Sequence, residues 1–203
     1  MRSILLSFLC SIISLTVYSQ NSTLIKNVNV WDGTSNTLSN NFSVLIEDNL
    51  IKTVARNISE PKGCTVIDGK GKTLIPGLSD AHVHLSATMS DSETRNDAHW
   101  MYTSIRTAKA AENFLMLGFT TVRDLGGPVF GVKRAIDEGL VPGPRIYPSG
   151  AYISQTSGHG DFRNANEPSV HLSGGQMQAA DLLGWSYVVD GVPEVLKAAR
   201  ENL

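Results

Sequence analysis

The sequence has few cysteines, no marked bias toward one sign of charge, and no apolar run long enough to cross a bilayer. Lys and Arg number 17 against 19 Asp and Glu, so the formal net charge is −2. This balance argues against the basic surfaces typical of proteins that bind nucleic acid or anionic membranes. With 41% hydrophobic and 18% charged residues, the composition is that of a soluble globular protein. We expect no nucleic-acid partner.

The N-terminal residues 1–19 have the pattern of a removable secretory signal. Arg2 supplies a positive start, residues 4–17 form an apolar run, and a small-x-small type cleavage site ends at Ser19. The run is shorter than the ~20 residues that span a bilayer, which argues against a stable membrane anchor. Lipidation at Cys10 stays open as the alternative to cleavage after Ser19. We expect an exported protein, either periplasmic or secreted.

Removal of that leader would leave Cys64 as the single cysteine, which excludes an intrachain disulfide. Cys64 precedes a strand-like run and is expected to be a small buried hydrophobe.

Residues 24–74 contain several short strand-like runs, at residues 24–30, 44–46, 50–51, 66–67 and 73–74. The turn sequences at 48–49 and 68–71 each predict a β-hairpin. A sheet of so few strands needs a partner to bury its apolar face.

From Leu78 onward strand-like and helix-like patterns alternate, which is typical of parallel βα units. The patterns predict strands at 119–125 and 145–153 and helices at 99–117, at 129–138 and from Pro193 onward. Apolar residues at helical spacing predict buried stripes on the first helix (Met101, Ile105, Ala108, Ala111, Leu115) and on the last (Val192, Val195, Leu196, Ala199). Residues 154–191 have no strong period, although 176–183 could form one or two helical turns. Loops of that length are usually lids, binding loops or disordered.

The residues around which the second part is organised are 74–85, Leu-Ile-Pro-Gly-Leu-Ser-Asp-Ala-His-Val-His-Leu. Side chains alternate along a strand. Alternation puts Asp80, His82 and His84 on one face and the apolar Ala81, Val83 and Leu85 on the other. One face of this strand is therefore chemical, and the other is suited to packing under helices.

Two imidazoles at this spacing converge within reach of one small cation, and neutral imidazole is a common zinc ligand. A bare His-x-His pair is more often two hydrogen-bonded core histidines. Here three features favour a metal site: Pro76-Gly77 interrupts regular structure just before the strand, Asp80 precedes the pair, and the opposite face is apolar. We therefore expect His82 and His84 to bind a divalent metal.

At these residues the sequence resembles the amidohydrolase superfamily, whose first barrel strand carries Asp-x-His-x-His after a Pro-Gly-apolar-x stretch. Residues 118–127, 142–146 and 157–161 are similar to the following segments of the subgroup related to imidazolonepropionases and Xaa-Pro dipeptidases. The resemblance extends from about Thr23 to the last residue.

The resemblance implies an α/β fold, a (β/α)₈ TIM-type barrel preceded by part of a small β-sandwich. Residues 20–74 would be the N-terminal part of the sandwich, and residues 75–203 the first part of the barrel. A complete barrel needs about 250 residues, so only the first three βα units are expected here. Leu203 ends a predicted helix without a cap, and we expect the chain to be an N-terminal fragment.

The chemistry implied by the resemblance is metal-dependent hydrolysis of a C–N bond in an amide, dipeptide or cyclic amide. The family's other groups are a carboxylated lysine on strand four, histidines on strands five and six, and a general-base aspartate on strand eight. All are expected beyond Leu203, so the catalytic base is unknown and this chain alone should be inactive. The cofactor would be one or two divalent ions, with zinc the first expectation.

Two alternatives to this function stay open. One is a non-catalytic binding protein on the same scaffold, and the other is a cyclic-imide hydrolase. In each case the expected partner is a small molecule or dipeptide, and an oligomer is possible.

Among the remaining polar residues, His159 stands between two glycines, where backbone can approach a ligand closely. From its residues alone, a ligand contact and an exposed turn are equally favoured. The resemblance implies that His159 lies beside the substrate. The neighbours Arg123 and Asp124 are expected to form a structural ion pair, and His99 and His171 to be surface or loop residues.

Overall fold

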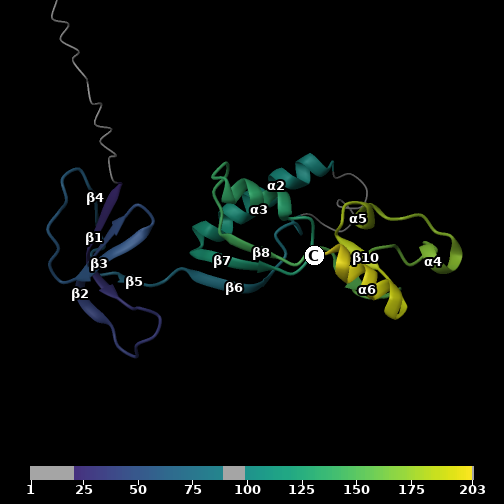
Figure 1. Ribbon diagram of the computed structural model, residues 1–203, viewed down its shortest axis with the longest axis horizontal. Coiled ribbons are helices and arrows are strands. Elements are labelled where there is room, and N and C mark those ends of the chain that lie inside the picture. The colour runs from purple at the N-terminus through teal and green to yellow at the C-terminus, as the bar shows by residue number, and fades with distance from the viewer. Residues whose placement is uncertain (1–20, 89–98, 203) are drawn as a thin grey trace, which may run out of the picture. The chain divides into compact units, whose positions relative to one another are not determined.

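The computed structural model describes residues 21–88 and 99–202 (Figure 1). The predicted leader at 1–19 lies outside the described residues. The chain divides into two compact units, Met1–Pro76 and Gly77–Leu203, and each is described by itself. Among the described residues, no helix combines the length and apolar character that crossing a membrane would require.

The first unit contains a five-stranded mixed sheet. Its strands are β1 (Ser22–Val30), β2 (Ser39–Glu47), β3 (Leu50–Ala55), β4 (Thr65–Asp68) and β5 (Thr73–Leu74). The order is β3-β2-β1-β4, and β5 also pairs with β1. The predicted hairpin at 48–49 is confirmed, since β2 and β3 pair antiparallel and Asp48 has a positive φ of 54°. Leu24, Val28 and Val44 are buried in this unit.

The second predicted hairpin is wrong, because β4 and β5 each pair in parallel with β1 rather than with one another. The turn between them is bound to β1: Gly69 N–H donates to the Lys26 carbonyl (2.8 Å) and Gly71 N–H to the Asn27 carbonyl (2.7 Å). Asn27 has a positive φ of 54° and lies where the pairing register between β1 and β2 shifts, between Ile25 and Val28.

The described part of the first unit has one sheet layer, not the two of a sandwich. Ile51 stays 69% exposed on β3, and Val66 and Ile67 on β4 are also exposed. Cys64 is half-buried rather than buried as predicted.

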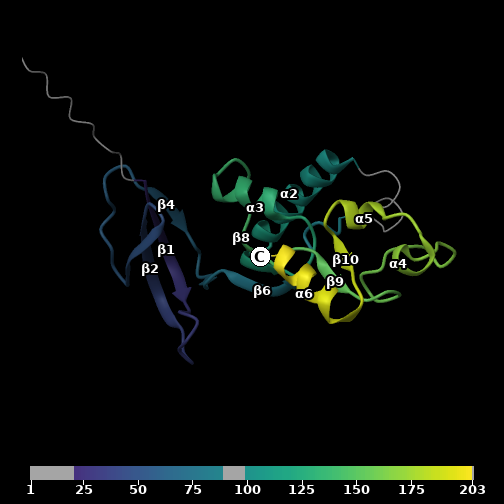
Figure 2. The same ribbon diagram turned by 45° about the vertical axis from the view of Figure 1, so that its right-hand side comes forward.

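The second unit is built on a parallel sheet of order β6-β7-β8. The strands are β6 (Leu78–Val83), β7 (Phe119–Asp124) and β8 (Arg145–Pro148), and the connecting helices are α2 (Trp100–Met116) and α3 (Phe130–Asp137). Both helices lie on the same side of the sheet (Figures 1 and 2). The core between these layers consists of Val83, Leu85, Ala111, Val122, Val129 and Ile146. The predicted alternation of strand and helix is confirmed, and the sheet is open, not a closed barrel.

The strand predicted at 145–153 is instead two strands, β8 and β9 (Tyr152–Ser154). Between them the Asn202 side chain binds both backbone groups of Ala151: Ala151 N–H donates to Oδ1 (3.0 Å) and Nδ2 donates to the carbonyl (2.9 Å). Gly150 has φ +84°, a left-handed conformation that favours glycine. After residues 150–151 the chain no longer follows the β6-β7-β8 sheet. Instead, β9 pairs in parallel with β10 (Ser186–Val188).

The buried faces of two helices differ from the predicted stripes. α2 buries Thr103, Thr107 and Ala111, whereas Met101 and Ile105 are exposed. A threonine can face the core here because Thr107 Oγ1 donates to the Thr103 carbonyl (2.9 Å) within the helix. In α6 (Gly191–Glu201) the buried residue is Ala198, and the stripe residues Val192, Val195 and Leu196 are exposed.

The stretch 154–191 contains more regular structure than its sequence suggested. It holds β10 and the short helices α4 (Val170–Ser173) and α5 (Ala179–Leu182), the latter within the predicted turn at 176–183. His171 lies in α4.

Expressed alone, residues 20–203 are expected to be insoluble or loosely packed. Among the described strands, β6 and β8 each have one paired neighbour, and open apolar strand edges promote aggregation. Parallel sheets are also normally covered on both faces. Dye binding to exposed apolar surface and near-UV circular dichroism during heating are the measurements. A monodisperse monomer with a sharp cooperative transition would contradict this expectation.

Candidate functional site

The side chains of His82 and His84 converge at the carboxyl end of β6. Their Nε2 atoms are 3.3 Å apart, and the ring centroids are 5.1 Å apart at an interplanar angle of 87°. His82 is exposed and His84 is half-buried. Both rings therefore point away from the core that Val83 and Leu85 enter.

The convergence depends on an irregularity in β6 that simple alternation did not predict. Asp80 pairs with Val122 and Val83 pairs with Asp124, so Ala81 and His82 together stand opposite one residue of β7. This is the arrangement of a β-bulge, which often redirects a side chain near a functional site. The predicted faces are correct for Val83 and Leu85.

The predicted faces of Asp80 and Ala81 are wrong. Ala81 is exposed rather than packed in the core. Asp80 shares register with Val122, and its carboxylate accepts the N–H of His82 (3.0 Å). The carboxylate thus stabilises the bulged backbone rather than accompanying the imidazoles.

The geometry of the two imidazoles fits a tetrahedral metal ion. With Zn–N bonds of about 2.0–2.1 Å, two ligand nitrogens of a tetrahedral zinc lie about 3.3–3.4 Å apart. The observed Nε2 separation of 3.3 Å agrees with that spacing. Across residues 21–88 and 99–202, no group of three or more His, Cys, Asp or Glu side chains is arranged to hold a metal. The described residues thus offer two ligands, whereas a catalytic zinc usually has three from the protein.

Tyr152, which the sequence reasoning did not single out, orients one of the imidazoles. Its hydroxyl lies 2.9 Å from His84 Nδ1, and the two ring centroids are 5.3 Å apart. In the tautomer that donates Nδ1–H to the hydroxyl, Nε2 of His84 carries the lone pair that a metal ion would need. Gly126 permits this packing, since a Cβ there would lie 2.6 Å from the tyrosine ring.

Asp124 fixes the backbone that follows the histidines. It is fully buried, and its carboxylate accepts the N–H of Leu85 (2.7 Å) and of Gly126 (3.2 Å). Burial raises the pKa of Asp124, against the opposing effects of these two donors and of His84. Burial, together with the nearby Asp124 charge, also raises the pKa of Tyr152, so its hydroxyl stays protonated at neutral pH.

The predicted ion pair between Arg123 and Asp124 is wrong. Neighbouring strand residues point to opposite faces. Arg123 is exposed on the sheet face lined by Ala81 and Tyr147, while Asp124 is buried against the backbone of Leu85.

His159 lies near this cluster, on the loop that follows β9. Its ring is perpendicular to that of Tyr152, with centroids 6.3 Å apart, and it is exposed. The Tyr152 ring thus contacts both His84 and His159. His99 lies elsewhere: it is exposed as predicted, and its Nδ1 accepts the N–H of Met101 (3.3 Å) at the start of α2.

Comparison with known proteins identifies a matching family, similar sequences and similar solved structures. Residues 73–203 match the Amidohydrolase family. Ochratoxinase from Aspergillus niger is 33% identical over 172 residues, which cover 79% of this chain. Two solved structures cover 90% of the chain: a prolidase complexed with N-methylphosphonate-L-proline (TM-score 0.75, 32% identity) and a Xaa-Pro dipeptidase with bound methionine (TM-score 0.72, 30% identity).

The chain spans less than half of each of these proteins. The matched region is 35% of the ochratoxinase and 44% of the prolidase and dipeptidase chains. The likeness therefore concerns only part of each relative's length.

Replacing Asp124 with Asn is expected to lower the free energy of unfolding of the whole protein by about 1–3 kcal/mol, because the amide can accept through only one oxygen and one buried N–H would lose its partner. Chemical denaturation measures the change. Asp137→Asn is the matched control, since Asp137 lies in an exposed ion pair with Lys133. Equal stability of the Asp124 variant and the parent would show that the hydrogen bonds from Leu85 and Gly126 to Asp124 do not stabilise the fold.

Proposed function

This chain belongs to the amidohydrolase family, and we propose that the whole protein is a metal-dependent hydrolase of a carbon–nitrogen bond in a small substrate. The observation that carries the proposal is the convergence of His82 and His84, whose Nε2 atoms are spaced like two ligands of one tetrahedral ion. Because the chain covers less than half of the length of these relatives, the activity is proposed for the whole protein.

The residues of this chain would hold and orient the metal. His82 and His84 would bind the metal through Nε2. Tyr152 would hold the His84 ring in place through its hydrogen bond with Nδ1, as hydrogen-bond partners of metal-binding histidines commonly do. A bound zinc ion would lower the pKa of a coordinated water to about 7 and polarise a carbonyl oxygen. Asp124 would keep the backbone after His84 in place through its bond to Leu85 N–H.

His159 would act on the substrate rather than on the metal. It contacts the same Tyr152 ring as His84, and its exposed imidazole is available to an incoming ligand. From there it would donate a hydrogen bond to the carbonyl oxygen of the bond to be cleaved.

The proposed substrate is a dipeptide or another small amide. The prolidase and the Xaa-Pro dipeptidase, both with TM-scores above 0.7, support an Xaa-Pro dipeptide, and ochratoxinase supports testing ochratoxin as well. A phosphate ester is disfavoured because the basic side chain near His159, Arg163, is already bound to the Asp161 carboxylate.

His82→Ala and His84→Ala should each remove most of the zinc bound by the whole protein, because a catalytic zinc depends on every protein ligand. In the same elemental analysis and zinc titration, Tyr152→Phe should retain zinc but bind it about 10- to 100-fold more weakly. His99→Asn, which preserves a helix cap, is the control and should bind zinc normally. Normal zinc content in both His82→Ala and His84→Ala would rule out the metal site.

His159→Ala should lower kcat about 10²- to 10³-fold, the usual effect of losing one such donor. The substrate for this assay is chosen by screening the whole protein against Xaa-Pro dipeptides, N-acyl amino acids, ochratoxin, cyclic imides and phosphotriesters. Zinc content should be unchanged in this variant. Cleavage of phosphotriesters alone, or full activity of the variant on an amide, would be incompatible with the role given to His159.

A further inference from the structure

The loop that carries His159 is closed by hydrogen bonds on both sides of the imidazole. Ser157 N–H donates to Asp161 Oδ2 (2.7 Å), and Asp161 N–H donates to the Gly158 carbonyl (3.1 Å). Gly160 N–H donates to Ser154 Oγ on β9 (3.0 Å). The backbone before and after His159 is therefore fixed by its own loop and by the preceding strand.

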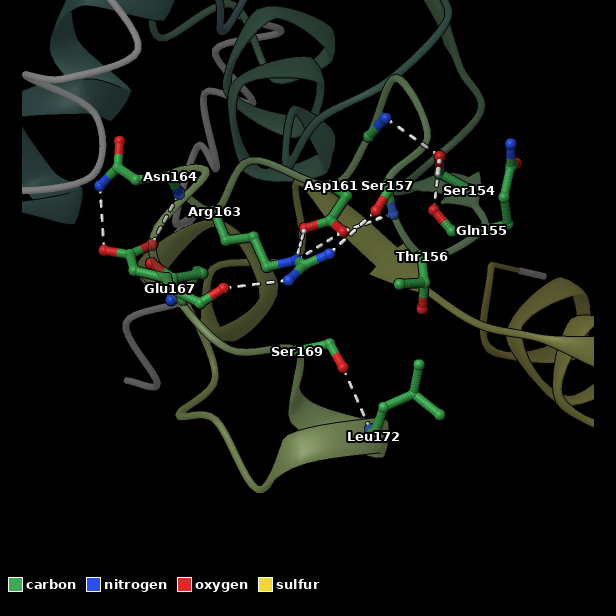
Figure 3. Close-up of polar contacts among 12 residues, drawn as sticks. Ser154, Gln155, Thr156, Ser157, Asp161, Arg163, Asn164, Glu167, Ser169 and Leu172 are labelled. Carbon is green, nitrogen blue, oxygen red and sulfur yellow. Dashed lines mark hydrogen bonds and ion pairs between the residues drawn. The ribbon is translucent and has the colours of Figure 1, made fainter.

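One guanidinium connects the two ends of this loop. Arg163 Nε donates to both carboxylate oxygens of Asp161 (3.0 and 2.8 Å), and Nη2 donates to Ser157 Oγ (3.0 Å). Nη1 donates to the Glu167 carbonyl (3.0 Å), which ties the loop to the next turn of the chain. Figure 3 shows the Arg163 side chain at the centre of these contacts.

The pair is largely shielded from solvent. The side chains of Arg163 and Asp161 are 20% and 5% exposed. Burial raises the pKa of Asp161, but the hydrogen bonds from Arg163 and Ser157 outweigh it and hold the pKa below its usual value. The carboxylate is thus ionised at neutral pH. Removing one partner of such a shielded pair leaves a charge without its counterion, so the pair resists opening.

The loop presents its histidine toward the site. The His159 ring lies perpendicular to that of Tyr152, whose hydroxyl contacts His84. Phe162 packs on the same tyrosine, with ring centroids 6.0 Å apart. His159 and Phe162 flank Asp161 from opposite ends of a short segment. A shift of the Arg163–Asp161 pair would therefore move both rings that contact Tyr152.

We propose that Arg163 is a positioning residue, which through Asp161 and Ser157 holds the loop in the conformation that presents His159 beside Tyr152. This inference rests on the proposed function of His159 and adds the residue on which that function depends. Direct recognition of a substrate anion by Arg163 is disfavoured, because Nε, Nη1 and Nη2 all already donate within the protein.

A double-mutant cycle on the whole protein tests this proposal. Arg163→Lys replaces the planar fork with a single ammonium, which cannot bond Asp161, Ser157 and Glu167 together. We expect kcat on an Xaa-Pro dipeptide such as Met-Pro to fall about 10- to 100-fold, as a misplaced catalytic group does. KM and zinc content should change little. Introduced into His159→Ala, the same change should produce no further loss, because residues acting through one another are not additive.

Controls separate the possible failures. Arg134→Lys alters an exposed pair with Glu138 and should leave kcat unchanged. Asp161→Asn should behave like Arg163→Lys and serves if that variant does not fold. Full activity of His159→Ala would refute the proposed function itself. If His159→Ala is impaired but Arg163→Lys adds its full loss in that background, or raises KM there, the positioning role is refuted. Loss of zinc from the Arg163 variant would also refute it.

Discussion

The site depends on how the end of β6 is held against β7. Val83 and Leu85 enter the core, and the bulge opposite Arg123 lies beside the two histidines, whose rings are on the other side. The buried Asp124 carboxylate accepts the Leu85 N–H, so the chain just beyond His84 cannot shift without leaving a buried donor unpaired. The position of two polar side chains is thus set by apolar packing and one buried hydrogen bond.

Around this point the chain adds supports from segments far apart in sequence. Tyr152 comes from β9, which pairs with β10 and follows Ala151, whose backbone is bound by the Asn202 side chain. Gly126 leaves room for the tyrosine ring. The same ring meets His159, whose loop is closed by Asp161 and Arg163. Metal ligation and substrate contact would consequently share one tyrosine as their common neighbour.

The sequence alone was informative about local features. The inward faces of Val83 and Leu85, the ends of α2 and α3, and the β2-β3 hairpin follow from strand alternation, helical period and turn chemistry, but the bulge beside His82 does not. The β4-β5 hairpin failed because an irregular β1 offered both strands a partner. The stripe on α6 was wrong, and that on α2 was correct for Ala111 but wrong for Met101 and Ile105. Hydrophobicity does not reveal which face a neighbouring layer covers, and in α2 two threonines face inward beside Ala111.

The supports of the site could not be found from the sequence because they join distant positions. Asp124 and Leu85 are 39 residues apart, and Tyr152 and His84 are 68 apart. Nothing in the local pattern of Ala151-Tyr152-Ile153 distinguishes this tyrosine from any other on a strand. Arg163 follows Asp161 by only two residues, but its bonds to Ser157 and Glu167 depend on the folded loop.

The most direct test of the metal-binding account is anomalous diffraction from a crystal of the whole protein, collected on both sides of the zinc absorption edge. The account predicts an anomalous peak about 2.0–2.1 Å from Nε2 of both His82 and His84. It also predicts that Nδ1 of His84 remains hydrogen-bonded to Tyr152. A fully occupied zinc peak that contacts neither histidine would contradict the account.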